Sequence, residues 1–261
     1  HTYEFLRRAD LLLVSPGVPE DHAVLSRLKA EGKPLLGELA VDAGHLKMPV
    51  VAVTGTNGKT TVTSLIGELI RSAGKDVFVG GNIGMPIYDF IDSGAIADVA
   101  VLEVSSFQLL LAGDFSPDIG VLLNITPDHL DRHKTLSGYG DAKMNLFARQ
   151  NDDQQAILAL DDPECAKRLD SIGRGRGLSF GSGSSCDMRV DGDTIISRRT
   201  QAVYQLQDTA LAGPIGVLNS AAAILAVETL GIAPDCIRDG LKRFQPGPHR
   251  LQLVNSVGGV R

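Results

Sequence analysis

The chain has 261 residues, 43% of them hydrophobic, and a formal net charge of −6 at pH 7. It can therefore fill a packed core, and its acidic balance disfavours a dedicated nucleic-acid-binding protein, which usually carries a basic face. Three separated cysteines without a CxxC pair indicate free thiols in a reducing compartment. No apolar run approaches the about 20 residues that cross a bilayer. We expect a cytoplasmic protein without nucleic-acid partners or membrane insertion.

The first elements of the chain are predicted to complete an α/β unit. Residues 11–14 indicate a short buried strand, and a helix over about 21–31 and a strand at 34–36 follow. The turn that closes the first strand consists of Ser15, Pro16 and Gly17. The opening strands of such a unit are missing and the chain starts without Met, so we expect that it is cut from something longer.

A phosphate-binding loop is the strongest motif. An apolar strand at 50–54 leads into a glycine-bracketed turn, and a helix is expected over 59–73. Such glycines let backbone N–H groups face phosphates, Lys59 reaches the outer phosphates, and Thr60 is placed to hold Mg²⁺. The general pattern has a further glycine where this chain has Val53, so the loop is a shorter form. Its residues are Gly55, Thr56, Asn57, Gly58, Lys59, Thr60 and Thr61.

The rest of the chain predicts a mostly parallel sheet flanked by helices, with a small antiparallel addition. Further strands are expected at 77–79, 99–104, 119–124, 156–159 and 177–180. Further helices are expected at 137–149, 217–230 and 234–243. An antiparallel hairpin is expected from 188–190 and 194–196, with another strand at 202–206. Ligands bind beyond the carboxyl ends of parallel strands, so the loops at those ends should carry the chemistry.

Three further loops carry polar side chains at strand ends. Glu103 would come beside the phosphate loop, where a hard divalent cation prefers oxygen ligands; the alternative is a solvated strand-end carboxylate. His129 stands among aspartates and could ligate a metal, or could be a capping or surface histidine. Asn82, within the glycine-rich 80–84, offers a donor and an acceptor to a ligand, or belongs to an ordinary turn.

Together these loops resemble the Mur ligases, ATP-dependent enzymes that add amino acids to the peptidoglycan precursor. The S-S-F-Q-L phrase favours the members that add D-glutamate over those that add lysine or diaminopimelate. One departure precedes the last long helix, where Ile215 and Gly216 replace a His and an Asn of the family's G-x-H-N-x-x-N. The matching segments are G-T-N-G-K-T-T at 55–61, G-G-N-I-G at 80–84, L-E-V-S-S-F-Q-L at 102–109, N-I-T-P-D-H-L-D-R at 124–132 and P-H-R at 248–250.

The resemblance also implies a division into domains. Residues 1–46 would be the C-terminal part of a nucleotide-sugar-binding domain and 47–250 a central P-loop-type ATPase domain. Residues 251–261 would start an amino-acid-binding domain. On this comparison we expect a monomer, and we expect this fragment alone to bind ATP and Mg²⁺ weakly without completing ligation.

The implied reaction joins D-glutamate to UDP-N-acetylmuramoyl-L-alanine. ATP phosphorylates the L-alanine carboxylate, and the D-glutamate amine then attacks the acyl phosphate. Two Mg²⁺ ions and Lys59 would offset the repulsion between the anionic groups. Catalytic roles fall to Lys59, Glu103, His129 and Lys143, with Lys143 carbamylated so that it becomes an oxygen ligand. Metal ligands would be Thr60, Glu103, His129 and Lys143.

The remaining roles implied by the resemblance concern the two bound substrates. ATP would contact the phosphate loop together with Asn219 and Arg250. The sugar-peptide substrate would contact Ser15, Pro16, Gly17, Asn82, Ser105 and Ser106. Two alternatives stay open: a folylpolyglutamate-type ligase, against which S-S-F-Q-L and G-G-N-I-G speak, and an ATP-binding module that does not ligate.

Overall fold

A nine-stranded sheet forms the centre of the chain in the computed structural model, which describes residues 2–19 and 21–247. The strand order is β11-β10-β9-β8-β7-β6-β3-β5-β4. The bounds are β3 (Val50–Thr54), β4 (Val77–Gly81), β5 (Val99–Glu103), β6 (Ile119–Leu122), β7 (Gln155–Ala159), β8 (Arg176–Gly181), β9 (Met188–Asp191), β10 (Thr194–Ser197) and β11 (Val203–Gln205).

The pairing confirms the predicted mostly parallel sheet with an antiparallel addition. Every pair of neighbours from β4 through β5, β3, β6, β7 and β8 to β9 is parallel, whereas β10 pairs antiparallel with both β9 and β11. The chain passes from β3 out to β4, returns to β5 beside β3, and then crosses to β6 on the other side of β3. Ligands bind at such a reversal of strand order, so β3 and its two neighbours mark the expected site.

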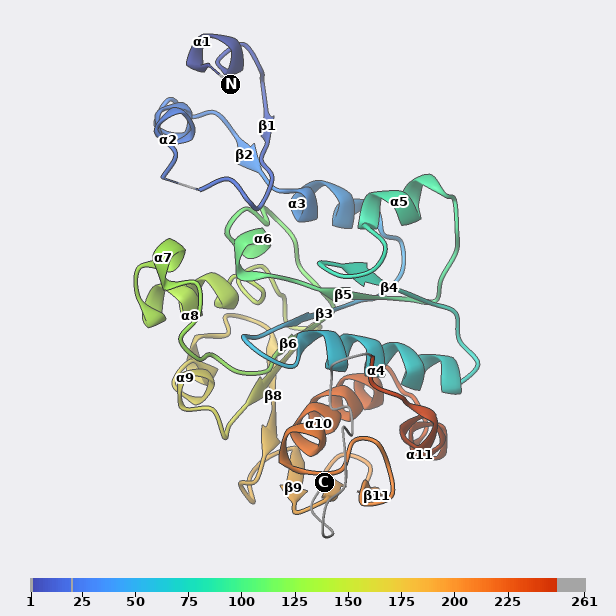
Figure 1. Cartoon of the computed structure of the whole chain (residues 1–261). Coiled ribbons are helices and arrows are strands. Elements are labelled where there is room, and N and C mark those ends of the chain that lie inside the picture. The colour runs from blue at the N-terminus through green and yellow to red at the C-terminus, as the bar shows by residue number, and fades with distance from the viewer. Residues whose placement is uncertain (1, 20, 248–261) are drawn as a thin grey trace.

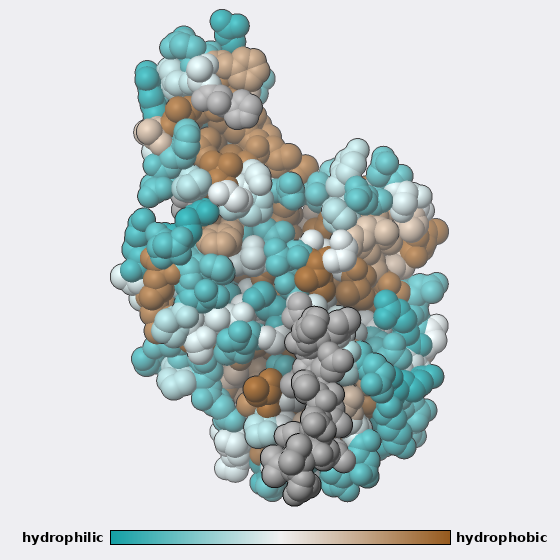
Figure 2. All heavy atoms as spheres, viewed as in Figure 1, coloured by the Kyte–Doolittle hydropathy of each residue, from teal (hydrophilic) through white to brown (hydrophobic). Residues whose placement is uncertain are grey.

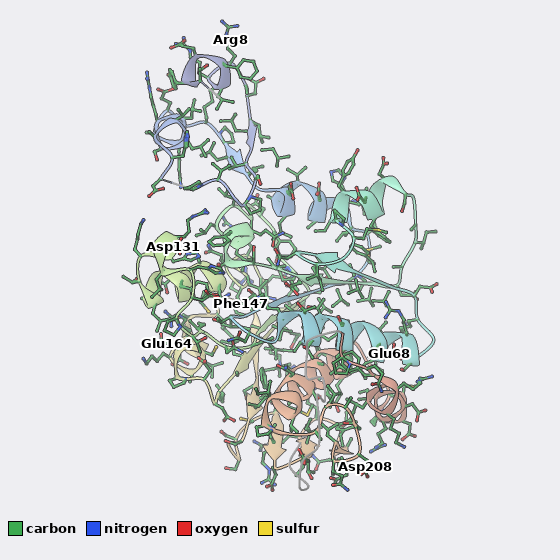
Figure 3. All side chains as sticks on the ribbon, in the orientation of Figure 1. Arg8, Glu68, Asp131, Phe147, Glu164 and Asp208 are labelled. Atoms are coloured by element: carbon green, nitrogen blue, oxygen red, sulfur yellow. The ribbon has the colours of Figure 1, made fainter. Side chains whose placement is uncertain are left out.

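Helices cover both faces of this sheet (Figure 1). Val51 and Val53 of β3 belong to the core under α4 (Lys59–Ser72), α10 (Pro214–Thr229) and α11 (Pro234–Arg243). Val50 and Ala52 belong to the opposite core, where Phe147 lies in the interior (Figure 3). A strand buried on both faces needs a continuous apolar run, which explains the sequence of β3. The helices of this second layer include α3 (Glu38–Asp42), α5 (Ile87–Asp92), α6 (Ser106–Leu110) and α8 (Leu136–Met144).

Short helices are the main departure from the predicted elements. The strand predicted at 119–124 ends at Leu122, and the helix predicted over 137–149 ends at Met144. A capping box explains α6, because the Ser105 hydroxyl accepts from the Gln108 N–H while the Gln108 side chain accepts from the Ser105 N–H. The helical elements not predicted are α5, α6, α7 (Leu130–His133), α9 (Pro163–Ala166), η1 (Ala43–His45) and η2 (Leu169–Ser171), together with α1 (Tyr3–Leu6) and α3.

A separate N-terminal unit precedes the large sheet (Figure 1). Its parallel strands are β1 (Leu12–Leu13) and β2 (Leu35–Leu36), with α2 (Ala23–Ala30) between them in the chain. Apolar surface lies over this unit (Figure 2), where Leu13 remains 56% exposed. Among the described residues no helix has the length and apolar character needed to cross a bilayer.

A buried carboxylate ties the antiparallel edge of the sheet to α10. Glu228 is 6% exposed and accepts hydrogen bonds from the hydroxyls of Ser197 at 2.7 Å, Thr200 at 2.9 Å and Tyr204 at 2.8 Å. Burial and the neighbouring carboxylate raise the pKa of Tyr204, so the phenol remains a donor. These donors satisfy a charge that would otherwise be costly to bury.

We expect Tyr204→Phe to lower the free energy of unfolding by about 1–3 kcal/mol, because Glu228 loses a donor while remaining buried. Urea unfolding followed by circular dichroism measures the change. Thr194→Val is the matched control, since the Thr194 hydroxyl contacts the exposed Gln205 side chain, and it should shift stability by less than about 0.5 kcal/mol. Equal losses in the two variants would contradict the role given to Glu228.

Candidate active site

The loop between β3 and α4 requires its glycines. Gly58 precedes the helix with φ 87°, a left-handed conformation that disfavours side chains. A Cβ at Gly58 would lie 2.6 Å from Oδ1 of Asn219, and a Cβ at Gly55 would lie 2.9 Å from Cβ of Leu123. The loop is therefore packed closely between β6 and α10, with the N-terminus of α4 at its end.

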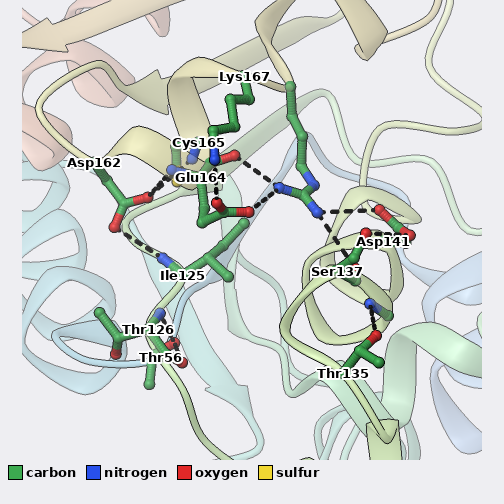
Figure 4. Close-up of polar contacts among 12 residues, drawn as sticks. Thr56, Ile125, Thr126, Thr135, Ser137, Asp141, Asp162, Glu164, Cys165 and Lys167 are labelled. Carbon is green, nitrogen blue, oxygen red and sulfur yellow. Dashed lines mark hydrogen bonds and ion pairs between the residues drawn. The ribbon is translucent and has the colours of Figure 1, made fainter.

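Asn124, just after β6, fixes the shape of this loop. Its Oδ1 accepts from the N–H groups of Thr56 at 3.0 Å and Asn57 at 2.8 Å, and its Nδ2 donates to the Asn57 carbonyl at 3.0 Å. The Thr56 hydroxyl also accepts from the Thr126 N–H at 3.0 Å (Figure 4). A single amide side chain thus orders successive backbone groups of a loop suited to phosphates. Asn124 begins the quoted N-I-T-P-D-H segment, but its role was not predicted.

Two lysines converge on the carbonyl of Gly55. Nζ of Lys59 donates to the carbonyls of Gly55 and Thr56, both at 2.9 Å, and Nζ of Lys143 donates to Gly55 at 2.8 Å. Lys143 is 1% exposed. Burial, and after it the charge of Lys59, lowers the pKa of Lys143 to about 7. The predicted phosphate-binding lysine and the predicted modified lysine therefore lie at the same loop.

Glu103 joins the loop from β5. Its Oε2 accepts from the Thr60 hydroxyl at 2.7 Å, and its Oε1 accepts from Nδ2 of Asn82 at 3.0 Å. The carboxylate is 3% exposed. A hydroxyl and a carboxylate at a helix N-terminus are hard oxygen donors of the kind that Mg²⁺ prefers, so these residues fit the predicted metal.

His129 lies apart from that pair. It adopts a left-handed conformation with φ 51°, and its Nε2 lies 3.5 Å from Oδ2 of Asp128. Its ring centroid is 5.0 Å from that of Phe107. Within residues 2–19 and 21–247, no cluster of three or more His, Cys, Asp or Glu could hold a metal ion. Of the four predicted metal ligands, Thr60 and Glu103 are joined by a hydrogen bond. Lys143 donates to the backbone of the loop. Among the described residues, the His129 side chain makes no hydrogen bond with these three residues, and its ring lies beside Asp128 and Phe107.

The predicted substrate contacts fall in two places. Ser105 forms the cap of α6, and Ser106, 3% exposed, shares a 3.0 Å hydrogen bond with Nε2 of His133. Burial lowers the pKa of His133 below its ordinary value, with the charge of Lys143 as the next cause. Ser15, Pro16 and Gly17 form the loop after β1, near α7.

Of the two departures at the start of α10, the one at Gly216 agrees with a steric constraint of this backbone. Ile215 is 67% exposed, and a Cβ at Gly216 would collide with the carbonyl oxygen of Leu211. No side chain of the family's size fits at 216 while the backbone keeps this path. Asn219, predicted to contact adenine, lies against Gly58. Arg250 lies outside the described residues, as do 248–249 and 251–261.

Arg168 fixes α8, the helix that carries Lys143. Its guanidinium donates to Glu164 Oε2 at 2.8 Å in α9 and to Asp141 Oδ1 at 3.3 Å in α8 (Figure 4). A Cβ at Gly140 would lie 2.6 Å from its Cζ, so a glycine admits the arginine. No role at the site was predicted from the sequence for Arg168 or for Tyr139, whose ring lies 4.4 Å from Nζ of Lys143.

Comparisons with known proteins show what the chain is similar to. The family profile described as the Mur ligase middle domain matches residues 53–227. A UDP-N-acetylmuramoylalanine–D-glutamate ligase of Desulfotalea psychrophila is 48% identical over 100% of this chain and 57% of its own length. The corresponding ligase of Pelotomaculum thermopropionicum is 40% identical over 97% of this chain and 56% of its own.

The chain belongs to the Mur ligase family. It spans 57% of the length of the first of these relatives. Solved structures of Mur ligases share the fold. A UDP-N-acetylmuramoyl-L-alanyl-D-glutamate–2,6-diaminopimelate ligase aligns with a TM-score of 0.67 at 22% identity, over 95% of this chain and 62% of that chain. MurF ligase from Thermotoga maritima, in complex with ADP, aligns with a TM-score of 0.65 at 19% identity, over 97% and 68%.

We expect Asn124→Ala to weaken the binding of Mg²⁺–ATP to this Mur ligase chain about tenfold, because the loop loses three ordering hydrogen bonds. Titration calorimetry measures the dissociation constant. The control is Asn151→Ala, which removes an exposed asparagine whose side-chain oxygen accepts a hydrogen bond from the Asp153 N–H at 2.9 Å. An unchanged constant in Asn124→Ala, or an equal loss in the control, would contradict this role.

Proposed function

We propose that the chain is the ATP-binding part of a ligase that adds D-glutamate to UDP-N-acetylmuramoyl-L-alanine in the cytoplasm. The observation that carries the proposal is the contact between Thr60 at the start of α4 and Glu103 at the end of β5, 2.7 Å apart beside a phosphate-binding loop. The relatives named as D-glutamate ligases support the choice of substrates.

The phosphates of ATP would lie on the backbone N–H groups at the start of α4, where the helix favours negative charge. Lys59 would leave the carbonyls of Gly55 and Thr56 and turn to the outer phosphates. Thr60 and Glu103 would hold Mg²⁺, with His129 and Lys143 serving a second ion. Bound Mg²⁺ supplies positive charge that lets the substrate carboxylate approach the γ-phosphate. The resulting acyl phosphate would then react with the D-glutamate amine.

Lys143 would act as a carbamate. A carbamate forms when a neutral amine attacks carbon dioxide and loses a proton, and its oxygens can ligate a metal. The lowered pKa of Lys143, about 7, supports this modification, because about half of the amine is neutral at pH 7. The neighbouring cation of Lys59 also favours an anionic group at this position.

The domain assignment belongs to the same proposal. Residues 1–46, which include the small N-terminal sheet, would be part of a nucleotide-sugar-binding domain, with 15–17 and Asn82, Ser105 and Ser106 toward the substrate. Residues 47–250 would be the ATPase domain, with Asn219 and Arg250 toward the nucleotide. We propose that the protein acts as a monomer.

Phosphate release tests the proposal. A protein that carries this chain within the full length of its relatives should release phosphate from ATP only when both UDP-N-acetylmuramoyl-L-alanine and D-glutamate are present. Lys59→Ala should lower the rate at least about 100-fold, because charge on the transferring phosphate loses a preorganised partner. Phosphate release that does not depend on D-glutamate, or that is faster with a folate substrate, would contradict the proposal. So would a Lys59→Ala variant that remains active and has a native circular dichroism spectrum.

The carbamate gives a separate pH-dependent prediction. In protein equilibrated with ¹³C-bicarbonate, a carbamate carbonyl resonance should be present at pH 8 and absent from Lys143→Arg. The signal should fall as the pH drops from 8 to 6, because protonation removes the neutral amine as the pH passes about 7. A resonance that survives in Lys143→Arg, or that grows on acidification, would contradict the assignment. Lys167→Arg, at an exposed lysine directly after α9, is the matched control.

A further inference from the structure

The short helix α7 is held between two residues in unfavourable backbone conformations. His129 has φ 51° and Lys134 has φ 67°, and among the described residues Gln201 is the only other non-glycine residue with positive φ. Such conformations persist only where the surroundings hold them in place. The direction of the side chains on α7 is therefore imposed by its neighbours. Figure 3 shows Asp131 of this helix at the edge of the molecule.

Arg132 of α7 reaches the loop after β1. Its Nη1 donates to the carbonyl of Gly17 at 3.3 Å and its Nη2 donates to the carbonyl of Val18 at 3.2 Å. These partners precede it by more than a hundred residues and belong to the N-terminal unit. A planar guanidinium can hold two neighbouring acceptors at once, which a lysine cannot do in the same way.

The other face of the same guanidinium lies over an aromatic ring. Cζ of Arg132 is 4.7 Å from the ring centroid of Phe107 in α6, a cation–π contact. That ring is also 5.0 Å from His129 and stacks on His133 at 5.3 Å. Because α6 follows directly after Glu103 and its cap Ser105, one side chain connects the N-terminal loop with the segment that ends β5.

Direct packing between the two units is limited at this position. A cavity separates them beside α7, lined by residues that include Pro19, Asp21, Arg132 and Lys134. An ion pair across it joins Lys134 to Asp21 at 3.6 Å, with side chains 70% and 75% exposed, and exposed pairs of this kind contribute little. The half-buried Arg132 therefore bears most of the polar connection through α7.

We propose that Arg132 is a positioning residue that holds the loop 15–18 in place over the phosphorylation site. The inference rests on the proposed function, in which this loop contacts the UDP-sugar substrate. Without the arginine, the loop would still follow β1, but it would no longer be held in a fixed position relative to Glu103 and His129. The loss should therefore weaken the binding of the sugar-peptide substrate and leave the binding of ATP, at the loop between β3 and α4, almost unaffected.

Two measurements on Arg132→Met test the proposal. Hydrogen exchange should show the Val18 amide, which donates to the Ser15 carbonyl at 3.0 Å, exchanging at least about threefold faster. Calorimetry should show UDP-N-acetylmuramoyl-L-alanine binding about tenfold more weakly, while Mg²⁺–ATP changes less than about twofold. Arg132→Lys should restore part of the affinity, because it keeps the cation on Phe107 but not both hydrogen bonds.

Lys134→Met is the matched control, since it removes a neighbouring cation and should change neither readout. Unchanged exchange at Val18 in Arg132→Met would overturn the proposal, and so would an equal loss of both ligands. If the unmodified protein binds ATP but not the UDP substrate, the proposed function fails instead. The exchange comparison then decides by itself whether Arg132 holds the loop.

Discussion

The hydrogen bond between the Thr60 hydroxyl and the Glu103 carboxylate depends on the order of strands around β3. Val53 of β3 pairs in register with Glu103 of β5 on one side and Val121 of β6 on the other. The phosphate loop, the carboxylate and Asn124 therefore leave the sheet at the same edge. Because helices cover both faces of the sheet, these strands must be apolar along their length. Polar side chains that can bind a ligand therefore occur only at and beyond the strand ends.

Positive charge accumulates at this edge around a small number of backbone acceptors. Lys59 and Lys143 both donate to Gly55, and burial drives the pKa of Lys143 down to about 7. Such a site favours whatever brings negative charge to it, whether a nucleotide phosphate or a carbamate. The conformation of Lys59 against the loop is consistent with a side chain that exchanges carbonyl oxygens for phosphate oxygens.

Much of this arrangement could be predicted from the sequence, because the long elements and the loop have local signals. The alternation of apolar strands with helical segments predicts the sheet and its helices. The glycines and Lys59 predict the phosphate loop from only a few neighbouring residues. The short helices could not be predicted in this way, since α6 depends on a capping box and α7 on two strained residues. Contacts between distant segments, such as Arg132 with Gly17 and Arg168 with Asp141, have no local signal at all. Asn124 lay within a quoted motif, but only the fold shows which backbone groups it holds.

A crystal structure of the protein with Mg²⁺ and ADP would show directly whether Thr60 and Glu103 form the metal site. We expect a Mg²⁺ ion ligated by the Thr60 hydroxyl beside the Glu103 carboxylate, with their present 2.7 Å hydrogen bond broken and Lys59 turned from the Gly55 carbonyl to the phosphates. A bound nucleotide whose metal lies elsewhere, with the Thr60–Glu103 bond intact, would contradict this expectation.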